Sequence, residues 1–371
     1  MIPVCEPTLL GNEKKYVLDC LETNWISSIG DYISKFEKMF AKFCGVNYGI
    51  ACNNGTTALH LMIEAMNIGK GDEVIIPTFT MIATANAVIY SGAKPILIDS
   101  ESETWNIDPK KIEEKITDKT KAIMVMHTYG HPCDMEAIQE IADKYNISII
   151  EDGAEAPGAE YKNKCVGSLG KAAAFSFYAN KIITTGEGGM VVTNNKDIAE
   201  KARLLRNHAF SKPRFLHKEF GFNYRMTNIQ AAIGVAQMEY ANELVEARIK
   251  NAKLYNNLLK DVGGITLPPK KEWVKNVYWM YGILIGKEFG VAVPEIRDAL
   301  LKRGIDTRTF FIPMHKQPVY LNNKKLNFPD CSGLYPVADM LSEKGFYLPS
   351  SSSLKKDQIK QICEILISLK K

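Results

Sequence analysis

Short apolar runs alternate with longer segments of helical periodicity over roughly residues 48–194 of the chain. The runs are short enough to be strands, whereas the segments between them repeat their apolar positions every three or four residues. Strands and helices that alternate in this way predict an α/β fold with a mostly parallel central sheet. The predicted strands are YGIAC (48–52), DEVIIP (72–77), KPILID (94–99), KAIMVMH (121–127), ISIIED (147–152) and AAAFSFY (172–178).

The pattern changes over residues 228–259, which form one long helical stretch. Its first half is rich in alanine, glycine and apolar residues, and its second half is highly charged. We interpret it as a single connecting helix that leads into a smaller domain, with a strand at 279–285 and a helix at 293–304. The sequence therefore predicts a large domain of residues 1–249 and a small C-terminal α/β domain of residues 250–371.

Composition narrows the class of protein without identifying it. The 371 residues are 46% hydrophobic and 24% charged, and the net charge of +4 is too small to indicate a nucleic-acid partner. The first residues, MIPVCEPTLLGNEKK, lack the layout of a signal peptide, and the apolar runs are too short to cross a bilayer. The eight cysteines stand singly, which is typical of a reducing compartment and does not match a zinc site. We expect a cytoplasmic protein.

The first candidate for chemistry is Lys181, in the stretch FSFYANKIITTGEGGM. It follows a predicted strand and precedes a turn that contains Gly186, Gly188 and Gly189. Most loop lysines are simply solvated. The alternative is a lysine placed to condense with a carbonyl compound.

Two further features follow strands of the same predicted sheet. Gly55, Thr56 and Thr57 open a helix, and the N–H groups of a helix N-terminus bind phosphate, although a plain N-cap explains the pattern as well. Asp152 ends a strongly apolar strand, where it is either a cap, an ion-pair partner or a functional carboxylate. Ligands bind beyond the carboxyl ends of the strands in such sheets.

Together, the phosphate cradle, Asp152 and Lys181 match the requirements of pyridoxal 5′-phosphate. The lysine forms a Schiff base, the aspartate pairs with the pyridinium nitrogen, and the helix N-terminus holds the phosphate. Ser176, on the strand that leads to the lysine, adds a hydroxyl to the same region. Two other classes fit less well. A binding protein without turnover is expected to lack the lysine or the aspartate, and no GxGxxG motif supports a nicotinamide-dependent oxidoreductase.

Longer motifs identify a family. NNGTTALHL, PTFTMIATANAV, GHPCDMEAI, IEDGAEAPGA, SFYANKIITTGEGGMVVTN and GFNYRMTNIQAAIGVAQ resemble the DegT/StrS sugar aminotransferases, in order and over nearly the whole chain. The resemblance implies an aspartate aminotransferase-like fold (fold type I) and a homodimer whose active sites are built from both subunits. Within the family, the runs GIACNNGTTALHL, NKIITTGEGGM and FNYRMTNIQAAIG are most similar to the GDP-perosamine synthases.

The resemblance also implies roles for single residues. Lys181 matches the Schiff-base lysine and Asp152 the partner of the pyridinium nitrogen. Glu155 matches a position near the cofactor ring, and Met81 stands where relatives usually stack an aromatic ring on the cofactor. The positions that match phosphate contacts are Gly55, Thr56 and Ser176, with Asn223 reaching the phosphate from the partner subunit.

The implied reaction moves an amino group from L-glutamate to a keto group, with pyridoxamine phosphate as the intermediate form of the cofactor. Relatives that deoxygenate sugars have histidine in place of Lys181, so its presence implies transamination. The implied acceptor is GDP-4-keto-6-deoxymannose, in the biosynthesis of an O-antigen or capsule polysaccharide. Phe215 and Leu216 replace a tyrosine–tryptophan pair of the perosamine synthases. This change leaves open a UDP- or dTDP-linked keto sugar, or a small phosphorylated ketone such as dihydroxyacetone phosphate.

Four residues are candidates to line the substrate cleft. Trp25 and Ser27 lie in the motif NWISSIG, and Arg308 and His315 lie in a C-terminal loop. Arg308 has the geometry to bind a diphosphate, but a surface ion pair explains it equally well. His315 is more simply a satisfied structural histidine, and Trp25 a core residue.

Overall fold

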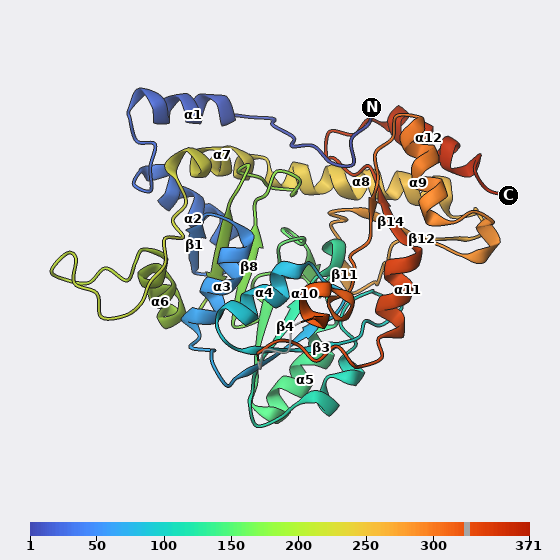
Figure 1. Ribbon diagram of the computed structural model, residues 1–371. Helices are drawn as coiled ribbons and strands as arrows, with labels where there is room; N and C mark the ends of the chain where they lie inside the picture. The colour runs from blue at the N-terminus through green and yellow to red at the C-terminus, as the bar shows by residue number, and fades with distance from the viewer. Residues whose placement is uncertain (323–326) are drawn as a thin grey trace.

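The computed structural model describes residues 1–322 and 327–371 (Figure 1). Its main sheet has seven strands in the order β1-β9-β8-β5-β4-β2-β3. Every described pair in this sheet is parallel except the two that β9 makes with its neighbours, so the predicted mostly parallel sheet is confirmed. The strands are β1 (Tyr48–Cys52), β2 (Glu73–Pro77), β3 (Lys94–Ile98), β4 (Thr120–Met126), β5 (Ser148–Asp152), β8 (Ala172–Ser176) and β9 (Gly189–Thr193).

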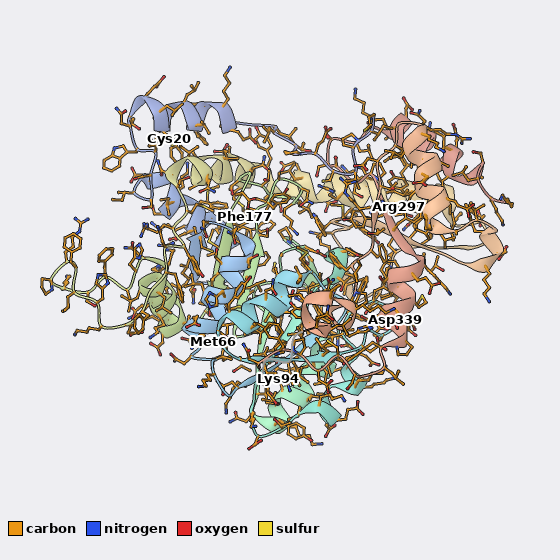
Figure 2. The ribbon with its side chains drawn as sticks, viewed as in Figure 1. Cys20, Met66, Lys94, Phe177, Arg297 and Asp339 are labelled. Carbon is orange, nitrogen blue, oxygen red and sulfur yellow. The ribbon has the colours of Figure 1, made fainter. Side chains whose placement is uncertain are left out.

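Helices cover both faces of this sheet, because successive side chains of a strand point to opposite faces. The ring of Phe175 lies 4.9 Å from that of Phe40 on one face, whereas Ser176 adjoins Gly55 on the other. Phe177, labelled in Figure 2, packs its ring 4.9 Å from Phe36 and from Phe40. The helices are α2 (Asp31–Cys44), α3 (Gly55–Ala65), α4 (Ile82–Tyr90), α5 (Met135–Tyr145) and α6 (Lys196–Arg206).

The long helical stretch at 228–259 is two helices, which corrects the prediction of one. They are α7 (Asn228–Glu239) and α8 (Ala241–Leu259), and the backbone leaves the helical region at Tyr240 (φ −122°, ψ 18°). The Tyr240 ring packs against Gly11, and the Glu239 carboxylate accepts hydrogen bonds from the segment that begins α1 (Glu13–Glu22). These tertiary contacts override a helical periodicity that continues without interruption in the sequence.

A second sheet has four strands in the order β10-β12-β14-β13. Its strands are β10 (Ile265–Thr266), β12 (Tyr281–Ile285), β13 (Arg308–Thr309) and β14 (Gly345–Leu348), and its helices are α9 (Val293–Lys302), α10 (Pro318–Leu321), α11 (Pro336–Lys344) and α12 (Lys356–Ile367). Three short strands, β6 (Glu160–Tyr161), β7 (Lys164–Cys165) and β11 (Val274–Lys275), form a third sheet. The short 3-10 helices are η1 (Pro109–Lys111), η2 (Glu113–Lys115), η3 (Thr128–Gly130), η4 (Lys287–Phe289) and η5 (Met314–Lys316).

The N-terminus lies with this second sheet and not with the first. The Ile2 N–H donates to the Gly304 carbonyl at 2.7 Å, and the Asp306 N–H donates to the Ile2 carbonyl at 2.9 Å. Both chain ends therefore lie beside α9 and α12 (Figure 1). Helix α8 runs through the predicted division at residues 249 and 250, and that division stays a prediction.

Two groups of buried side chains hold the layers together. The larger continues from the seven-stranded sheet into the four-stranded one, and the smaller lies around β2, β4 and α5, where it contains Ile75, Ile123 and Ile138. Within the described ranges, no helix combines the length and the apolar character that crossing a bilayer requires.

Candidate active site

A cavity of about 580 Å³ lies at the carboxyl ends of β1, β5 and β8. It is the place where the sequence predicts a site, because parallel strands end together at this edge. Its wall contains eight of the residues predicted from the sequence: Gly55, Thr56, Thr57, Met81, Asp152, Glu155, Ser176 and Lys181.

The N-terminus of α3 forms one wall of the cavity. Asn54 caps the helix, its side chain accepting a hydrogen bond from the Thr57 N–H at 2.9 Å, while the Thr57 hydroxyl accepts from the Asn54 N–H at 3.3 Å. A Cβ on Gly55 would lie 2.6 Å from the Ser176 Cβ, so the helix start is in close contact with the end of β8. N–H groups at the start of α3, together with hydroxyl groups of threonine and of Ser176, thus surround a space suited to an anion.

A substitution at Gly55 tests this wall. We expect Gly55→Ala to weaken the binding of pyridoxal phosphate about tenfold, because the added methyl group displaces Ser176 and the first turn of α3. Titration of the cofactor into cofactor-free protein measures the effect. Gly286→Ala is the matched control, since the nearest atom to its added Cβ lies 3.6 Å away. Equal affinities of the two variants would contradict the assignment of this wall to the cofactor.

Asp152 is buried at the end of β5, on the cavity side of the sheet. One carboxylate oxygen accepts from the Thr84 hydroxyl at 2.7 Å and the other from the Ala154 N–H at 3.1 Å. Burial raises the pKa of Asp152, while these two donors and the charge of Lys181 act in the opposite direction. A buried carboxylate of this kind gains from a further cationic partner in the cavity.

Lys181 lies in the loop that follows β8, where its N–H donates to the Tyr178 carbonyl at 2.9 Å. Its Nζ lies 3.8 Å from the centre of the Trp279 ring. Burial lowers the pKa of Lys181, although the carboxylates of Glu155 and Asp152 act in the opposite direction. A lowered pKa makes more of the neutral amine available, and the neutral amine is the form that attacks a carbonyl.

Glu155 is buried beside Lys181 and lines the same cavity. Its carboxylate accepts from the Tyr129 N–H at 2.8 Å, and burial raises its pKa. Tyr129 holds that N–H in place from a left-handed backbone conformation (φ 52°). The cavity wall therefore contains two buried carboxyl groups, those of Asp152 and Glu155, and one amine, which together can bind and move a proton.

These groups fit pyridoxal phosphate. The cavity joins an anion site at α3 and Ser176 to a buried carboxylate at Asp152, with the Lys181 amine in the same wall. The cofactor needs a partner for its phosphate, one for its ring nitrogen and an amine for its aldehyde carbon. Each need is met by a different element, so the three groups do not compete for one position.

Three other predicted residues lie outside this wall. Trp25 and Ser27 are exposed between α1 and α2, and their carbonyls accept hydrogen bonds from Asn228 at 2.7 and 2.6 Å. Asn223 is also exposed. The roles of all three stay predictions.

The two candidates from the C-terminal loop bind other residues of the chain. The Arg308 guanidinium donates to the Asp306 carboxylate at 2.6 Å. The two His315 ring nitrogens lie 2.8 Å from the Thr78 hydroxyl and 2.9 Å from the Asp339 carboxylate. Neither residue is in the cavity wall, and their roles in substrate binding stay predictions.

The structure adds residues that the sequence did not point to. The wall contains Trp279, Phe311 and Tyr347, which come from the C-terminal part of the chain, together with Asn180 and Tyr178 beside the lysine. Asn180 and Tyr178 could have been identified from the sequence, because they lie close to Lys181 in the chain. The first three carry no such signal, because their apolar surroundings are those of ordinary core residues.

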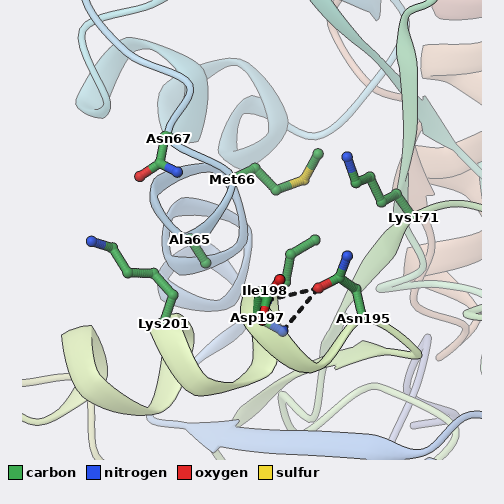
Figure 3. A pocket seen from close by; sticks show the side chains of 8 residues that line it. All are labelled: Ala65, Met66, Asn67, Lys171, Asn195, Asp197, Ile198 and Lys201. Carbon is green, nitrogen blue, oxygen red and sulfur yellow. Dashed lines mark hydrogen bonds between the residues drawn. The ribbon is translucent and has the colours of Figure 1, made fainter.

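A second hollow, of about 330 Å³, lies between α3 and α6 (Figure 3). The N–H groups in the first turn of α6 could bind an anion, but the Asn195 side chain already accepts hydrogen bonds from the Asp197 and Ile198 N–H groups. Lys201, on its rim, is paired with Glu219. The first turn of α6 and Lys201 therefore already have partners within the chain, and this hollow offers no combination of groups like that of Lys181, Asp152 and the start of α3.

Comparison with known proteins supports the chemistry of the cavity. The model of the DegT/DnrJ/EryC1/StrS aminotransferase family matches residues 7–367. GDP-perosamine synthase of Caulobacter vibrioides is 46% identical, with 98% of this chain and 97% of that protein covered. GDP-perosamine synthase of Escherichia coli O157:H7 is 44% identical, with 98% and 97% covered. The solved structure of Helicobacter pylori PseC, an aminotransferase involved in the biosynthesis of pseudoaminic acid, has a TM-score of 0.92 at 30% identity and covers 99% of this chain and 98% of that one.

Proposed function

We propose that this protein, which belongs to the DegT/DnrJ/EryC1/StrS aminotransferase family, transfers the amino group of L-glutamate to the keto group of a GDP-linked 4-keto-6-deoxy sugar. The enzyme is an aminotransferase of fold type I and uses pyridoxal 5′-phosphate. The observation that supports the proposal most directly is the meeting of Lys181, Asp152 and the start of α3 in one cavity. The similarity to two GDP-perosamine synthases supports the GDP-sugar.

Each wall of the cavity has a proposed role. The N-terminus of α3 and Ser176 would hold the phosphate, and Asp152 would hold the ring nitrogen. Lys181 would bind the aldehyde carbon. When bound, the cofactor supplies an electron sink that stabilises negative charge on the carbon that loses its proton. Glu155 is proposed to lie near the cofactor ring, and Met81 to cover one of its faces.

The amine of Lys181 is the group that moves the proton. Its lowered pKa lets it accept the proton of the amino donor as a neutral amine and then release that proton at a second atom nearby. The carboxylates of Glu155 and Asp152 stabilise the ammonium form in the interval. The apolar part of the wall, which includes Trp279 and Phe311, limits the access of water that would otherwise take the proton.

The acceptor is tested on enzyme loaded with pyridoxamine 5′-phosphate. We expect GDP-4-keto-6-deoxymannose to restore the visible absorbance of lysine-bound cofactor faster than a UDP- or dTDP-keto sugar or dihydroxyacetone phosphate, and mass spectrometry to identify the amino sugar. Faster restoration by one of the other acceptors would keep the aminotransferase and replace the GDP-sugar. L-glutamate is tested in the reverse half-reaction, against L-aspartate and L-glutamine.

We also propose that the enzyme acts as a homodimer with shared active sites. The loop between α6 and α7 projects from the body of the protein (Figure 1) and exposes Phe215 and Phe220, the latter at 99%. Trp25, Ile26 and Ile29 expose further apolar surface between α1 and α2. Apolar surface of this extent favours a subunit interface. Asn223, at the end of the same loop, is proposed to reach the phosphate bound by the partner subunit.

Mixing two variants, each of which is expected to be impaired, tests the sharing of sites. Lys181→Ala and Asn223→Ala subunits, unfolded together and refolded as a mixture, are expected to regain activity above that of either variant alone. In the mixed dimer, the Asn223→Ala subunit keeps its lysine and receives an intact Asn223 from its partner. If Asn223 served its own subunit, no mixed dimer would contain an intact site and activity would not return.

A further inference from the structure

The indole ring of Trp279 covers the amine of Lys181. Its centre lies 3.8 Å from Nζ, which is within the range in which an ammonium group is attracted to the face of an aromatic ring. Trp279 precedes β12 and is 4% exposed, so water is almost excluded from the ring. An ammonium group and an aromatic face attract each other more strongly when both are withdrawn from water.

The ring is held in this orientation from both ends of the residue. Its Nε1–H donates to the Asn180 carbonyl at 2.9 Å, which ties it to the residue next to Lys181. The Trp279 carbonyl accepts from the Arg248 guanidinium at 2.8 Å, and Arg248 also donates to the Ser352 hydroxyl at 3.0 Å. Arg248 is itself 3% exposed. Three other segments of the chain, at Asn180, Arg248 and Ser352, therefore hold Trp279 beside the amine.

We propose that Trp279 is a positioning residue for Lys181, whose indole face stabilises the ammonium form of the lysine while it holds a proton between two transfers. The proposal rests on the proposed function, because only a lysine that moves a proton needs this stabilisation. The charged or titratable groups that face the amine are Glu155, Asp152 and Cys5. The two carboxylates can take the proton themselves. An aromatic ring cannot, so it favours the ammonium form without becoming a competing base.

Two substitutions separate the aromatic face from the volume of the side chain. Trp279→Phe keeps a face over the amine and loses Nε1–H, whereas Trp279→Leu keeps apolar bulk and loses the face. Each full-length variant is loaded with pyridoxamine 5′-phosphate, so that Lys181 is not covalently bound. The rate at which acetic anhydride acetylates Lys181 is then measured by peptide mass spectrometry over a range of pH.

The pH profile of labelling is the decisive measurement. Expressed as a fraction of its high-pH plateau, the rate at a fixed pH below the pKa of Lys181 is expected to rise about fivefold in Trp279→Leu, because the ammonium form has lost its support. Trp279→Phe is expected to stay within about twofold of the unmodified enzyme. Profiles that coincide in all three proteins would overturn the proposal. A Phe variant that matches the Leu variant would also overturn it, since the hydrogen bond to Asn180 would then explain the effect.

A second measurement does not need the leucine variant to fold. The tryptophan fluorescence of the enzyme minus that of Trp279→Phe reports on Trp279. This difference is expected to change with pH, with the same midpoint as the labelling of Lys181. The same difference, measured in a Lys181→Met background, is expected to be flat over this range. A change that persists in that background overturns the proposal.

Failure of the proposed function is visible separately. Borohydride treatment of enzyme loaded with pyridoxal phosphate is expected to fix the cofactor on Lys181, as peptide mapping will show. Fixation on Lys181 with unmoved labelling profiles removes the role of Trp279 alone. Fixation on another residue removes the role of Lys181 itself, and the proposed role of Trp279 with it.

Discussion

Replacement of Lys181 by alanine is expected to lower the rate of amino transfer at least about 10³-fold, because in the proposed mechanism its amine both binds the cofactor and moves the proton. The rest of the proposed cofactor site belongs to other elements, namely α3, β5 and β8. The variant is therefore expected to bind pyridoxal phosphate without a covalent bond. Single-turnover measurements with L-glutamate give the rate, and borohydride reduction followed by mass spectrometry shows whether the cofactor is attached.

Lys171→Ala is the matched control, since Lys171 is an exposed lysine directly before the other end of β8. It is expected to keep the full rate and the covalent attachment of the cofactor. A Lys181→Ala enzyme that retains more than about a tenth of the rate would show that another group moves the proton. Glu155 would then be the first residue to test, because it lies buried in the same wall.

The sequence predicted the meeting in one cavity of those residues whose positions depend on local order. Gly55 and Lys181 follow strands, and Asp152 ends one, whose apolar runs are visible in the sequence, and the carboxyl ends of such strands meet at one edge. The pairing of β5 with β8 places Asp152 and Ala174 side by side, which brings the aspartate close to the loop of the lysine. No distance between these residues had to be known in order to group them.

The other part of the site depends on tertiary packing and could not be predicted in this way. Tyr347 enters the cavity from β14 of the four-stranded sheet and Trp279 from the segment just before β12, about a hundred residues or more beyond Lys181, and nothing in their own segments marks them. The break at Tyr240 has the same origin, because contacts with the segment around Gly11 cause it. The proposed roles of Trp25 and Asn223 could not be predicted from packing within one chain either, because they depend on the surface that a second subunit would cover.

Removal of the charge is expected to have different effects at two neighbouring residues: it lowers stability at Glu151 and slows the reaction at Asp152. Alternation along β5 points Asp152 toward the cavity and Glu151 away from it. The Glu151 carboxylate accepts hydrogen bonds from the Gly167, Leu169 and Gly170 N–H groups and lies 3.1 Å from His127 Nε2. Glu151→Gln places an amide N–H against these donors, and we expect it to lower the free energy of unfolding by about 1–3 kcal/mol, measured with urea.

Asp152→Asn is instead expected to slow amino transfer by about 10²–10³-fold, because the proposed role of Asp152 is to keep the ring nitrogen of the cofactor protonated, and a neutral asparagine cannot do this. In the cofactor-free protein, burial raises the pKa of Asp152, so at neutral pH the charged carboxylate costs stability. That cost is absent below the ordinary pKa of an aspartate and is complete above the raised value. Cofactor-free Asp152→Asn is therefore expected to be at least as stable as the unmodified protein at neutral pH, and loading with the cofactor is expected to reverse the order. If cofactor-free Asp152→Asn were less stable than the unmodified protein, loss of stability would explain its slow reaction, and the proposed role of this carboxylate would be contradicted. A stable but slow Asp152→Asn enzyme, together with an unstable Glu151→Gln enzyme, would assign Asp152 to the chemistry and Glu151 to folding.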